Sequence, residues 1–505
     1  MVSRSLRRPG ADDTRKQCPL ASGDIPHVSE ARERSLALFH RMFVEQAGAR
    51  FARKCARVTA TMLALGLCAC TSPSNRPSNL PLAETTASLR RSSSPDEAGS
   101  TAIILAFSGG GARSAAFGYG VLSALAEQPA RDGTALTLAD QVAAVAGVSG
   151  GGILAAHFAL YGPAGLGAFR RDYLDQDPEA ALRTAITPVN LLRGYRGGVN
   201  DLTGFGAWLD THLYHGATLG SLDRGKGPLL LLHATDLYNR APFAFDRASF
   251  RAICSDYDSF PLAHAVAASS AVPVLFAPVV LENFSPDCPL SARKAATPGR
   301  SALARHVEES QKRYETEADL RYLKLLDGGL VDNLAVHNLV RAMNRPTPAP
   351  LRAGAARHLR RVILIVADAS LRIGGDLSKT VEGPGAMDTI TASIDAMIDT
   401  GSRTGLDMLE HEAGLWRERL IQWRCGGKDA ERDCDRLDVT LVRLSLADVR
   451  DAAEKARILQ LSYKLSLKAD EVDFLSGLGR RQLLANADYR RLFGARGALR
   501  TVAAR

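Results

Sequence analysis

Ser149 stands in a stretch whose residue types suit a nucleophile. From residue 144 the sequence AVAGVSGGGILAAHFALYG leads through small apolar residues to Gly147-Val148-Ser149-Gly150-Gly151 and continues with an apolar segment of helical length. This G-x-S-x-G match falls between an expected strand and an expected helix, where a serine lies on a sharp turn. Gly147 and Gly150 carry no side chains where strand and helix almost touch. The helix start offers N–H groups and a positive dipole end to an anion beside Ser149.

A second glycine-rich turn follows an earlier apolar run. It contains Gly109, Gly110, Gly111 and Arg113, in the stretch FSGGGARSAAFGYG. The Gly-Lys-Ser/Thr ending of a P-loop is absent, and a serine replaces the third glycine of a dinucleotide-binding fingerprint, so we expect no nucleotide partner. Bare amides on such a turn can instead form an oxyanion hole that stabilises a tetrahedral intermediate. Arg113 would add positive charge at its edge.

Asp327 is the candidate base for Ser149. The stretch LLDGGLVDNLAV, residues 325–336, places Asp327 at the end of an expected strand, before a turn that begins with Gly328. A carboxylate there can project into the same end of the sheet as Ser149 and accept a proton from it. Taken alone, the Asp-Gly pair is better explained as an ordinary turn.

Three histidines are the alternative bases, because a serine triad would require one of them. His157 lies about two turns into the helix that follows Ser149, so we expect it to point away from the nucleophile. His264 precedes an apolar helix and is interpreted as a surface or helix-end residue. His337 follows Asp327 closely enough along the chain to stay open as a third member of the site.

The elements that must position these residues alternate between short apolar runs and helical patterns. Helices are expected at 112–127 and from about Gly150, and strands are expected at 101–107, 141–147, 228–235, 322–326, 360–368 and 436–445. Continuous apolar strands separated by helices predict an α/β fold with a mainly parallel sheet covered on both faces. Candidate site residues follow several of these strands, so the sheet would gather them at one edge.

Together these motifs resemble the patatin-like phospholipase family. The glycine turn with its basic residue, the nucleophile turn and the Asp-Gly pair occur in the family's order within about residues 101–370. Two further stretches are similar as well, ATDLYNRAPFAF at 234–245 and HAVAASSAVPVLFAPV at 264–279. The resemblance implies a three-layer α/β/α patatin-like hydrolase fold with a mainly parallel central sheet. The sequence pattern adds a helical C-terminal extension, which lies outside the resemblance.

The resemblance also implies a chemistry. Family members hydrolyse acyl esters with a Ser-Asp dyad and need neither histidine nor a metal or other cofactor. Ser149 is then the nucleophile, Asp327 is the base, and the oxyanion hole is formed by Gly109, Gly110, Gly111 and Arg113. We therefore expect a lipid acyl hydrolase that acts on phospholipid or lysophospholipid through an acyl-enzyme on Ser149.

Other functions remain compatible with the same residues. An esterase or thioesterase acting on soluble esters would use the same nucleophile, and an acyltransferase would pass the acyl group to an acceptor other than water. A non-catalytic lipoprotein that binds ligands with this fold is the alternative from another class. It is disfavoured because all three chemical motifs are intact.

The positive charge of the chain is concentrated near its beginning. The formal charge is +9, but residues 1–69 hold 12 Lys/Arg and 6 Asp/Glu, which leaves 51 and 48 for residues 70–505. The remainder is nearly balanced, so we expect no nucleic-acid partner.

Residues 50–70, RFARKCARVTATMLALGLCAC, explain this basic bias. A positive n-region precedes twelve mostly apolar residues, too few to span a bilayer and suited to a secretory signal. The ending resembles a bacterial lipobox, with Cys70 as the lipidated first residue after cleavage. We therefore expect residues 1–69 to be an N-terminal extension plus signal peptide. The mature protein would be anchored by lipid to a membrane of the bacterial envelope, such as the outer membrane, facing the periplasm.

Four cysteines would remain besides Cys70 after such cleavage, an even number compatible with an oxidising compartment. Pairing by proximity in sequence joins Cys254 to Cys288 and Cys425 to Cys434. The alternative is that all four are unrelated buried thiols. For Cys254 and Cys288, a disulfide and free thiols are about equally favoured, whereas the short spacing favours a disulfide between Cys425 and Cys434. None of the cysteine spacings is typical of a zinc site.

The rest of the chain divides by composition. Residues 70–100 are rich in Ser and Pro and are expected to form a flexible tether. The catalytic domain is expected at 101–370, with a polar excursion at 284–319. Residues 371–505 are expected to be mainly helical apart from one strand, with a role that the resemblance does not assign.

Overall fold

The structure is a computed structural model that describes residues 76–83, 100–130, 136–183, 185, 187–224, 227–288, 301–345, 348–351, 353–371, 381, 383–426, 432–461 and 464–493. All of these lie in the larger of two compact units, Ser72–Arg505. The smaller unit, Met1–Thr71, lies outside the described residues. The signal peptide and the lipidated Cys70 therefore stay predictions.

One mixed sheet forms the centre of the described part. Its strands are β1 (Thr101–Phe107), β2 (Val142–Gly147), β3 (Leu229–Asp236), β4 (Ala241–Ala244), β5 (Val279–Glu282), β6 (Tyr322–Leu326), β7 (Arg361–Asp368) and β8 (Asp438–Ser445). They lie in the order β5-β6-β3-β2-β1-β7-β8, and β4 pairs with β3 outside this path. From β3 to β8 all neighbours are parallel, whereas β4 and β6 run antiparallel to β3 and β5 runs antiparallel to β6. The expected mainly parallel sheet is confirmed.

The sequence pattern does not reveal β4 and β5. Each has four residues, and β4 contains Pro242, a residue that strand interiors rarely accept. The six strands that the apolar runs predict are all present, and β1 and β6 have the expected bounds.

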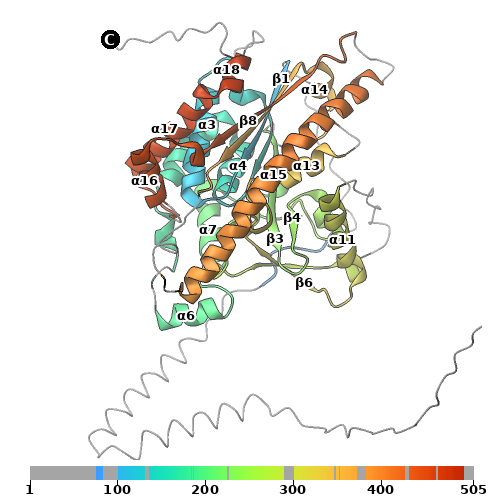
Figure 1. Cartoon of the computed structure of the whole chain (residues 1–505). Helices are drawn as coiled ribbons and strands as arrows, with labels where there is room; N and C mark the ends of the chain where they lie inside the picture. Colours follow the sequence, from blue (N-terminus) through green and yellow to red (C-terminus); the bar gives the residue numbers. More distant parts are fainter. Residues whose placement is uncertain are drawn as a thin grey trace, which may run out of the picture. The chain divides into compact units, whose positions relative to one another are not determined.

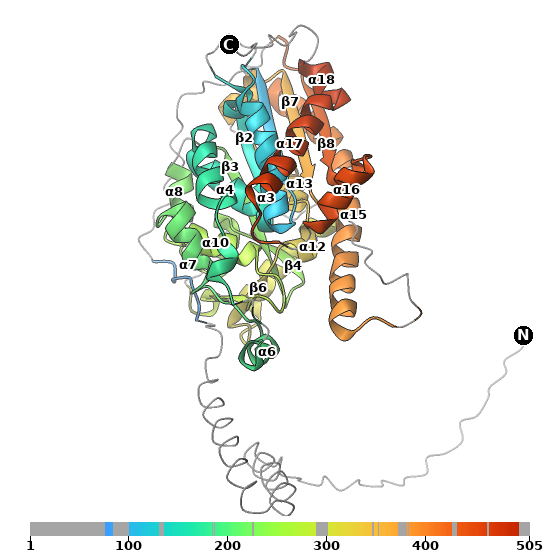
Figure 2. The same ribbon diagram turned by 90° about the vertical axis from the view of Figure 1, so that its left-hand side faces the viewer.

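Helices cover both faces of the sheet (Figures 1 and 2). They are α3 (Gly111–Ala126), α4 (Ser149–Tyr161), α5 (Leu166–Phe169), α6 (Pro188–Tyr195), α7 (Phe205–Leu209), α8 (Leu219–Arg224), α9 (Arg247–Ala252), α10 (Leu262–Ser269), α11 (Ala302–Thr316), α12 (Gly329–Asp332), α13 (Val336–Met343), α14 (Ala353–His358), α15 (Ala386–Cys425), α16 (Ala452–Gln460), α17 (Ala469–Ala485) and α18 (Ala487–Phe493).

Alternating strand residues build two separate cores. Ile103 and Leu105 of β1 point into a core with α3, α4, α10 and α17, whereas Ile104 and Ala106 point into a second core with α13 and α15. Because both faces are buried, β1 is apolar along its whole length rather than alternating. This arrangement confirms the expected three-layer α/β/α fold.

The C-terminal part is built into the same layers. Its strand β8 pairs in parallel with β7, and the long helix α15 packs over the second core (Figure 1). Helix α17 lies against α3, so close that a Cβ atom at Gly120 would be 1.9 Å from the carbonyl oxygen of Ser476. Residues beyond 371 therefore complete the sheet and cover both of its faces.

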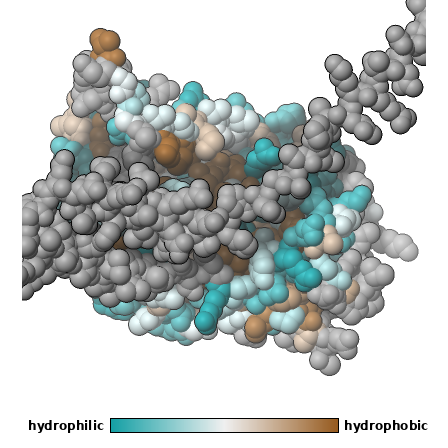
Figure 3. All heavy atoms as spheres, turned by 90° about the horizontal axis from the view of Figure 1, so that it is seen from below, coloured by the Kyte–Doolittle hydropathy of each residue, from teal (hydrophilic) through white to brown (hydrophobic). Residues whose placement is uncertain are grey.

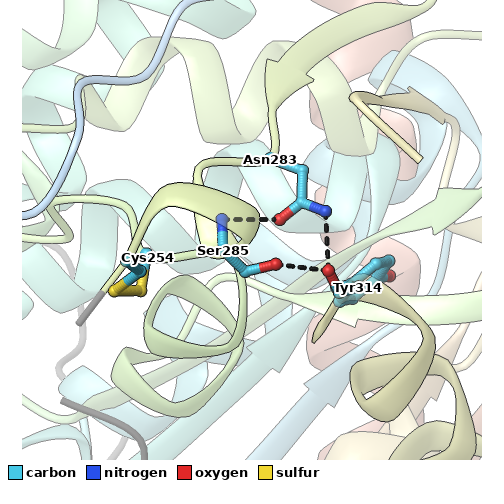
Figure 4. Close-up of a disulfide and its surroundings, with 5 residues drawn as sticks. Cys254, Asn283, Ser285 and Tyr314 are labelled. Atoms are coloured by element: carbon cyan, nitrogen blue, oxygen red, sulfur yellow. Dashed lines mark hydrogen bonds between the residues drawn. A yellow bond between two sulfur atoms is a disulfide. The ribbon is translucent and has the colours of Figure 1, made fainter. Parts of the chain in front are cut away.

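The polar excursion after β5 is fastened to the body of the domain (Figure 4). A disulfide joins Cys254 to Cys288. The amide of Asn283 donates to the carbonyl oxygen of Tyr314 at 2.8 Å, and the Ser285 hydroxyl donates to the same oxygen. A second disulfide joins Cys425 to Cys434 just before β8. Both pairs are the ones that proximity in sequence favours.

Part of the expected flexible tether at 70–100 is hydrogen-bonded to the domain. Within residues 76–83, the Ser78 N–H donates to Val280 at 3.2 Å, and the Asn79 side chain donates to Glu282 at 2.9 Å and accepts from its N–H at 2.8 Å. Strand β5 lies at the edge of the sheet, and its backbone groups need partners. The asparagine amide supplies them, which a Ser/Pro-rich composition does not reveal.

Among the described residues, no single helix is both long enough and apolar enough to cross a membrane. The pair Ser149–Tyr161 and Pro163–Leu174 passes on length and composition only when taken together, with a bend of 120° between them.

Candidate active site

Ser149 lies on the turn between β2 and α4. Strand β2 ends at Gly147, Val148 is extended, and Ser149 begins the helix with φ of 52°. A residue other than glycine held at positive φ costs about 1–3 kcal/mol, and such strain is common at functional sites. The end of α10 helps to hold this conformation, because the Ser149 N–H donates to the Ser269 hydroxyl at 3.2 Å. A Cβ atom at Gly150 would lie 1.9 Å from the Gly111 carbonyl oxygen, so only glycine fits there.

Asp327 follows directly after β6, as expected, and Gly328 precedes α12. Its backbone is fixed from two sides, because its N–H donates to Ala271 at 2.8 Å and its carbonyl accepts from the Thr235 hydroxyl at 2.8 Å. The carboxylate accepts the Gly329 N–H at 2.8 Å. The Asp327 side chain is thus held in one position beside Ser149.

The Asp327 carboxyl group and the Ser149 hydroxyl both line the base of the same pocket, and the hydroxyl lies close enough to lower the pKa of Asp327. Only 7% of Asp327 and 8% of Ser149 are exposed. Burial raises the pKa of Asp327 to about 6, against the opposing effects of the Gly329 N–H and the Ser149 hydroxyl. A carboxylate with this pKa is ionised at neutral pH and is a stronger base than an ordinary aspartate.

The glycine turn after β1 lies against Ser149, but its three N–H groups are not equivalent. The Gly109 N–H donates to the Asn333 carbonyl at 2.9 Å. It is therefore not free to stabilise an oxyanion, which corrects the expectation for this residue. Within the described part of the chain, the Gly110 N–H has no backbone acceptor. The expected donors that remain are Gly110 and Gly111, next to the buried Arg113.

Asn333 is a site residue that the sequence motifs do not single out. Its side-chain amide donates to the Ser370 hydroxyl at 2.7 Å, and its backbone carbonyl accepts the N–H of Gly109. It thereby ties the turn after β6 to the turns after β1 and β7. The signal was present in DGGLVDN, where Asn333 closes the stretch that Asp327 opens. Ser269, within the second family-like stretch, is likewise not singled out by the motifs. Both Asn333 and Ser269 act through contacts with residues that are distant in the sequence.

A segment from the C-terminal part reaches the glycine turn. The Lys464 carbonyl accepts the N–H of Ala112 at 3.2 Å, immediately after Gly111. Glu179 holds this segment, because its carboxylate accepts the N–H groups of Leu465 at 2.6 Å and Ser466 at 3.2 Å. We name residues 464–466 the clamp. It fixes the first turn of α3, on which the expected oxyanion donors lie.

A pocket of about 740 Å³ opens above Ser149 and Asp327. The glycine turn and Arg113 line its floor, and its walls are mainly apolar. The apolar lining residues are Ile153, Tyr173, Phe205, Val272, Pro273, Val274, Leu275, Leu330, Leu334, Leu371, Ile390, Ile394, Ile398, Leu406, Ala447 and Leu465. Helix α15 supplies one wall through side chains spaced by four residues, which share one helix face. The pocket can therefore hold an acyl chain next to the buried serine.

The histidines lie elsewhere. Burial lowers the pKa of His157 to about 4, and its ring packs against Tyr161 and Phe169. His264 is on α10, where burial also lowers its pKa. The His337 N–H donates to Asp332 at the start of α13. Among the described residues, none of the three lines the pocket. No group of three or more His, Cys, Asp or Glu side chains in the described ranges is arranged to hold a metal ion.

An α/β/α domain with a buried serine and carboxylate beneath an apolar pocket has the architecture of a lipid acyl hydrolase. Residues 105–340 match the family model described as patatin-like phospholipase. This part of the chain belongs to the patatin-like phospholipase family. The match contains both Ser149 and Asp327 and ends before β7.

Solved structures give more distant likenesses. The human GIVD cytosolic phospholipase A2 is 13% identical, with a TM-score of 0.34, over 78% of this chain and 61% of that one. The chain thus spans about three fifths of that protein's length. No curated protein sequence matches the chain.

Proposed function

We propose that this protein is a serine acyl-ester hydrolase that releases fatty acid from phospholipid or lysophospholipid through a Ser149–Asp327 dyad. The observation that carries the proposal is the placement of the buried Ser149 and Asp327 side chains together at the base of the apolar pocket. The serine supplies the nucleophile, the carboxylate supplies the base, and the pocket supplies a dry site for the acyl chain.

In the first step, Asp327 accepts the proton of the Ser149 hydroxyl while the serine oxygen attacks the ester carbonyl. Negative charge develops on the carbonyl oxygen. The N–H groups of Gly110 and Gly111 and the positive charge of Arg113 stabilise it. The tetrahedral intermediate collapses, the proton passes from Asp327 to the leaving alcohol, and the fatty acyl group stays on Ser149.

In the second step, water replaces the alcohol. Asp327 accepts a proton from the attacking water, and the same oxyanion donors stabilise the second tetrahedral intermediate. Collapse releases the fatty acid, and the proton returns to the Ser149 oxygen. The elevated pKa of Asp327 suits both directions of transfer, because the carboxyl group must gain and lose a proton in each cycle.

The test is release of fatty acid by the purified protein from phospholipid and lysophospholipid vesicles, measured by mass spectrometry. Release should disappear in Ser149→Ala and persist in Ser393→Ala, which changes an exposed serine on α15. An acyl adduct on Ser149 should be found by intact mass after rapid quenching. If Ser149→Ala released fatty acid as fast as the parent, the proposal would be wrong.

We also propose that the mature protein is a lipoprotein anchored through Cys70 on the periplasmic side of a bacterial membrane. The order of charged, apolar and cysteine residues at 50–70 supports this proposal. The intact mass of membrane-extracted protein should equal that of a chain starting at Cys70 plus the mass of the added acyl groups. Cys70→Ser should abolish this addition. A mature chain that retains residues 50–69 would contradict it.

A further inference from the structure

Exposed apolar side chains surround the mouth of the pocket. We define the apolar rim as Leu191, Leu192 and Tyr195 of α6, Val272 and Val274 before β5, and Ile390 and Met397 of α15. Their exposure is high for such residues: 90% for Tyr195, 64% for Leu191 and 53% for Met397. Figure 3 views the molecule from below and shows hydrophobic side chains gathered on this face between hydrophilic ones. Clustered exposure of this kind marks an interaction site.

The rim is continuous with the catalytic pocket. Val272, Val274 and Ile390 belong to the lining and are also exposed, so they mark the mouth. Helix α6 joins this loop through Val199, whose N–H donates to Val274 and whose carbonyl accepts from Arg193. A molecule seated on the rim would therefore lie directly above Ser149.

Val274 is held outward at a conformational cost. Its φ is 70°, a region that β-branched residues rarely adopt, and its side chain is 41% exposed. The hydrogen bonds from Val199 at 3.1 Å to the Val274 carbonyl and from Asn200 at 2.9 Å to the Leu275 carbonyl maintain it. Strained backbone conformations are frequent at functional sites, so an exposed valine held in one supports a role for this loop in binding.

The path of the N-terminal segment is consistent with a membrane on the same side, given the proposed Cys70 anchor. Ser78 bonds to Val280 and Asn79 bonds to Glu282, so the chain toward Arg76 runs in the direction of the rim loop. In the proposed lipoprotein, five residues lie between the acylated Cys70 and Arg76, so that Arg76 is the sixth residue after the anchor. Six residues span at most about 20 Å. The anchor thus keeps this end of the domain close to the bilayer.

From these observations we infer that the apolar rim docks on a phospholipid surface and aligns the pocket mouth with the acyl chains of the bilayer. Exposed Arg183 and Arg196 flank α6 and favour anionic head groups. This inference rests on the proposed function but adds a separate property, the face by which the enzyme meets its substrate. A lipid would then pass from bilayer to pocket without its acyl chain crossing water.

The test separates docking from hydrolysis and from the anchor. The parent is the full chain carrying Cys70→Ser and Ser149→Ala, which has neither an acyl anchor nor the nucleophile. Its binding to phosphatidylcholine vesicles, with and without phosphatidylglycerol, is measured by sedimentation. Adding Leu191→Ser, Tyr195→Ser and Met397→Ser should weaken binding at least about tenfold. These three side chains do not line the pocket.

The matched control adds Leu459→Ser and Leu484→Ser, which change leucines on α16 and α17 that are 40% and 38% exposed. Its binding should stay within about twofold of the parent. Equal loss in both variants, or no loss in the rim variant, would overturn the proposal. Self-association that the rim substitutions abolish, without vesicle binding by the parent, would assign the rim to a second copy instead.

Folding and function have their own readouts. The rim substitutions, placed in a chain with Ser149 intact, should leave hydrolysis of a soluble short-chain ester and the melting temperature unchanged. If they unfold the protein, Tyr195→Ser alone repeats the binding test at the most exposed of the three positions. Vesicle binding without any ester hydrolysis by the Ser149 protein would refute the proposed function and leave the docking surface standing.

Discussion

The two walls of the pocket are built in different ways. Ser149 and Asp327 follow strands of the sheet and are almost fully buried. The Ser149 N–H donates to the Ser269 hydroxyl, and Asp327 accepts from the Thr235 hydroxyl and the Gly329 N–H. The opposite wall is the first half of α15, where Ile390 is 45% exposed and Ile394 and Ile398 are half-buried. The sheet edge thus fixes the reacting atoms, whereas the helix offers a surface that can adapt to the chain of the substrate.

The strongest test of the rigid wall is Asp327→Asn. It keeps the shape but removes the base, so turnover should fall about 10²–10⁴-fold, as severely as in Ser149→Ala. The double variant should be no worse than either single one, because both residues act as one unit. Kinetics on folded variants, checked by melting temperature, gives the measurement.

The histidines are the controls for this comparison. His157→Gln, His264→Gln and His337→Gln should each cost far less than Asp327→Asn, since none of the three lines the pocket. A loss equal to that of Ser149→Ala in one folded histidine variant would replace the dyad with a triad.

The pKa of Asp327 predicts opposite effects of pH on activity and stability. Because the pKa is about 6, kcat/KM should rise with pH up to about 6 and then level, and should be about a hundredfold lower at pH 4. Between about pH 4 and 6 the folded protein retains a proton that the unfolded chain has released, so stability falls as pH rises through this window.

Asp327→Asn separates the two effects. The variant should no longer lose stability between about pH 4 and 6. Above pH 6 its free energy of unfolding should exceed that of the parent protein by at most about 3 kcal/mol. Denaturant unfolding at pH 4 and pH 8 checks it. A variant less stable than the parent at pH 8 would show that the buried carboxylate does not oppose folding.

The clamp tests how far the rigid wall depends on the C-terminal part. Glu179→Ala removes the acceptor for Leu465 and Ser466, which loosens Lys464 at the glycine turn, and should lower kcat about tenfold with little change in KM. Glu454→Ala is the matched control, because it breaks an exposed ion pair with Arg481 in the same part of the chain. A change confined to KM would show that the clamp shapes the pocket rather than the oxyanion donors.

The smallest effect is expected on the adaptable wall. Ile394→Ala removes apolar surface from the lining and should raise KM for long-chain substrates about three- to tenfold while kcat stays constant. Substrates with short chains should be unaffected. Thr400→Ala, at an exposed position of the same helix, serves as the control. A loss in kcat instead of KM would mean that α15 also positions the reacting ester.

Local patterns in the sequence predict the rigid wall better than its supports. Apolar runs reveal β1, β2 and β6, and the end of each run leads to Gly109, Ser149 and Asp327 in turn. The use of the Gly109 N–H by Asn333 depends on how two turns meet, which no local pattern encodes. No local pattern encodes the clamp or the hydrogen bonds between Asn79 and strand β5 either, because each joins residues that are far apart in the chain.

The bond between Lys464 and Ala112 sets an order in time as well as in space. Chains are made from the N-terminus, so the glycine turn exists long before the segment that fixes it. A chain still being synthesised, or one clipped before residue 464, has Ser149 and Asp327 but lacks the clamp. Under the proposed function, hydrolysis would therefore stay impaired until residues 464–466 have been synthesised and have folded against the glycine turn.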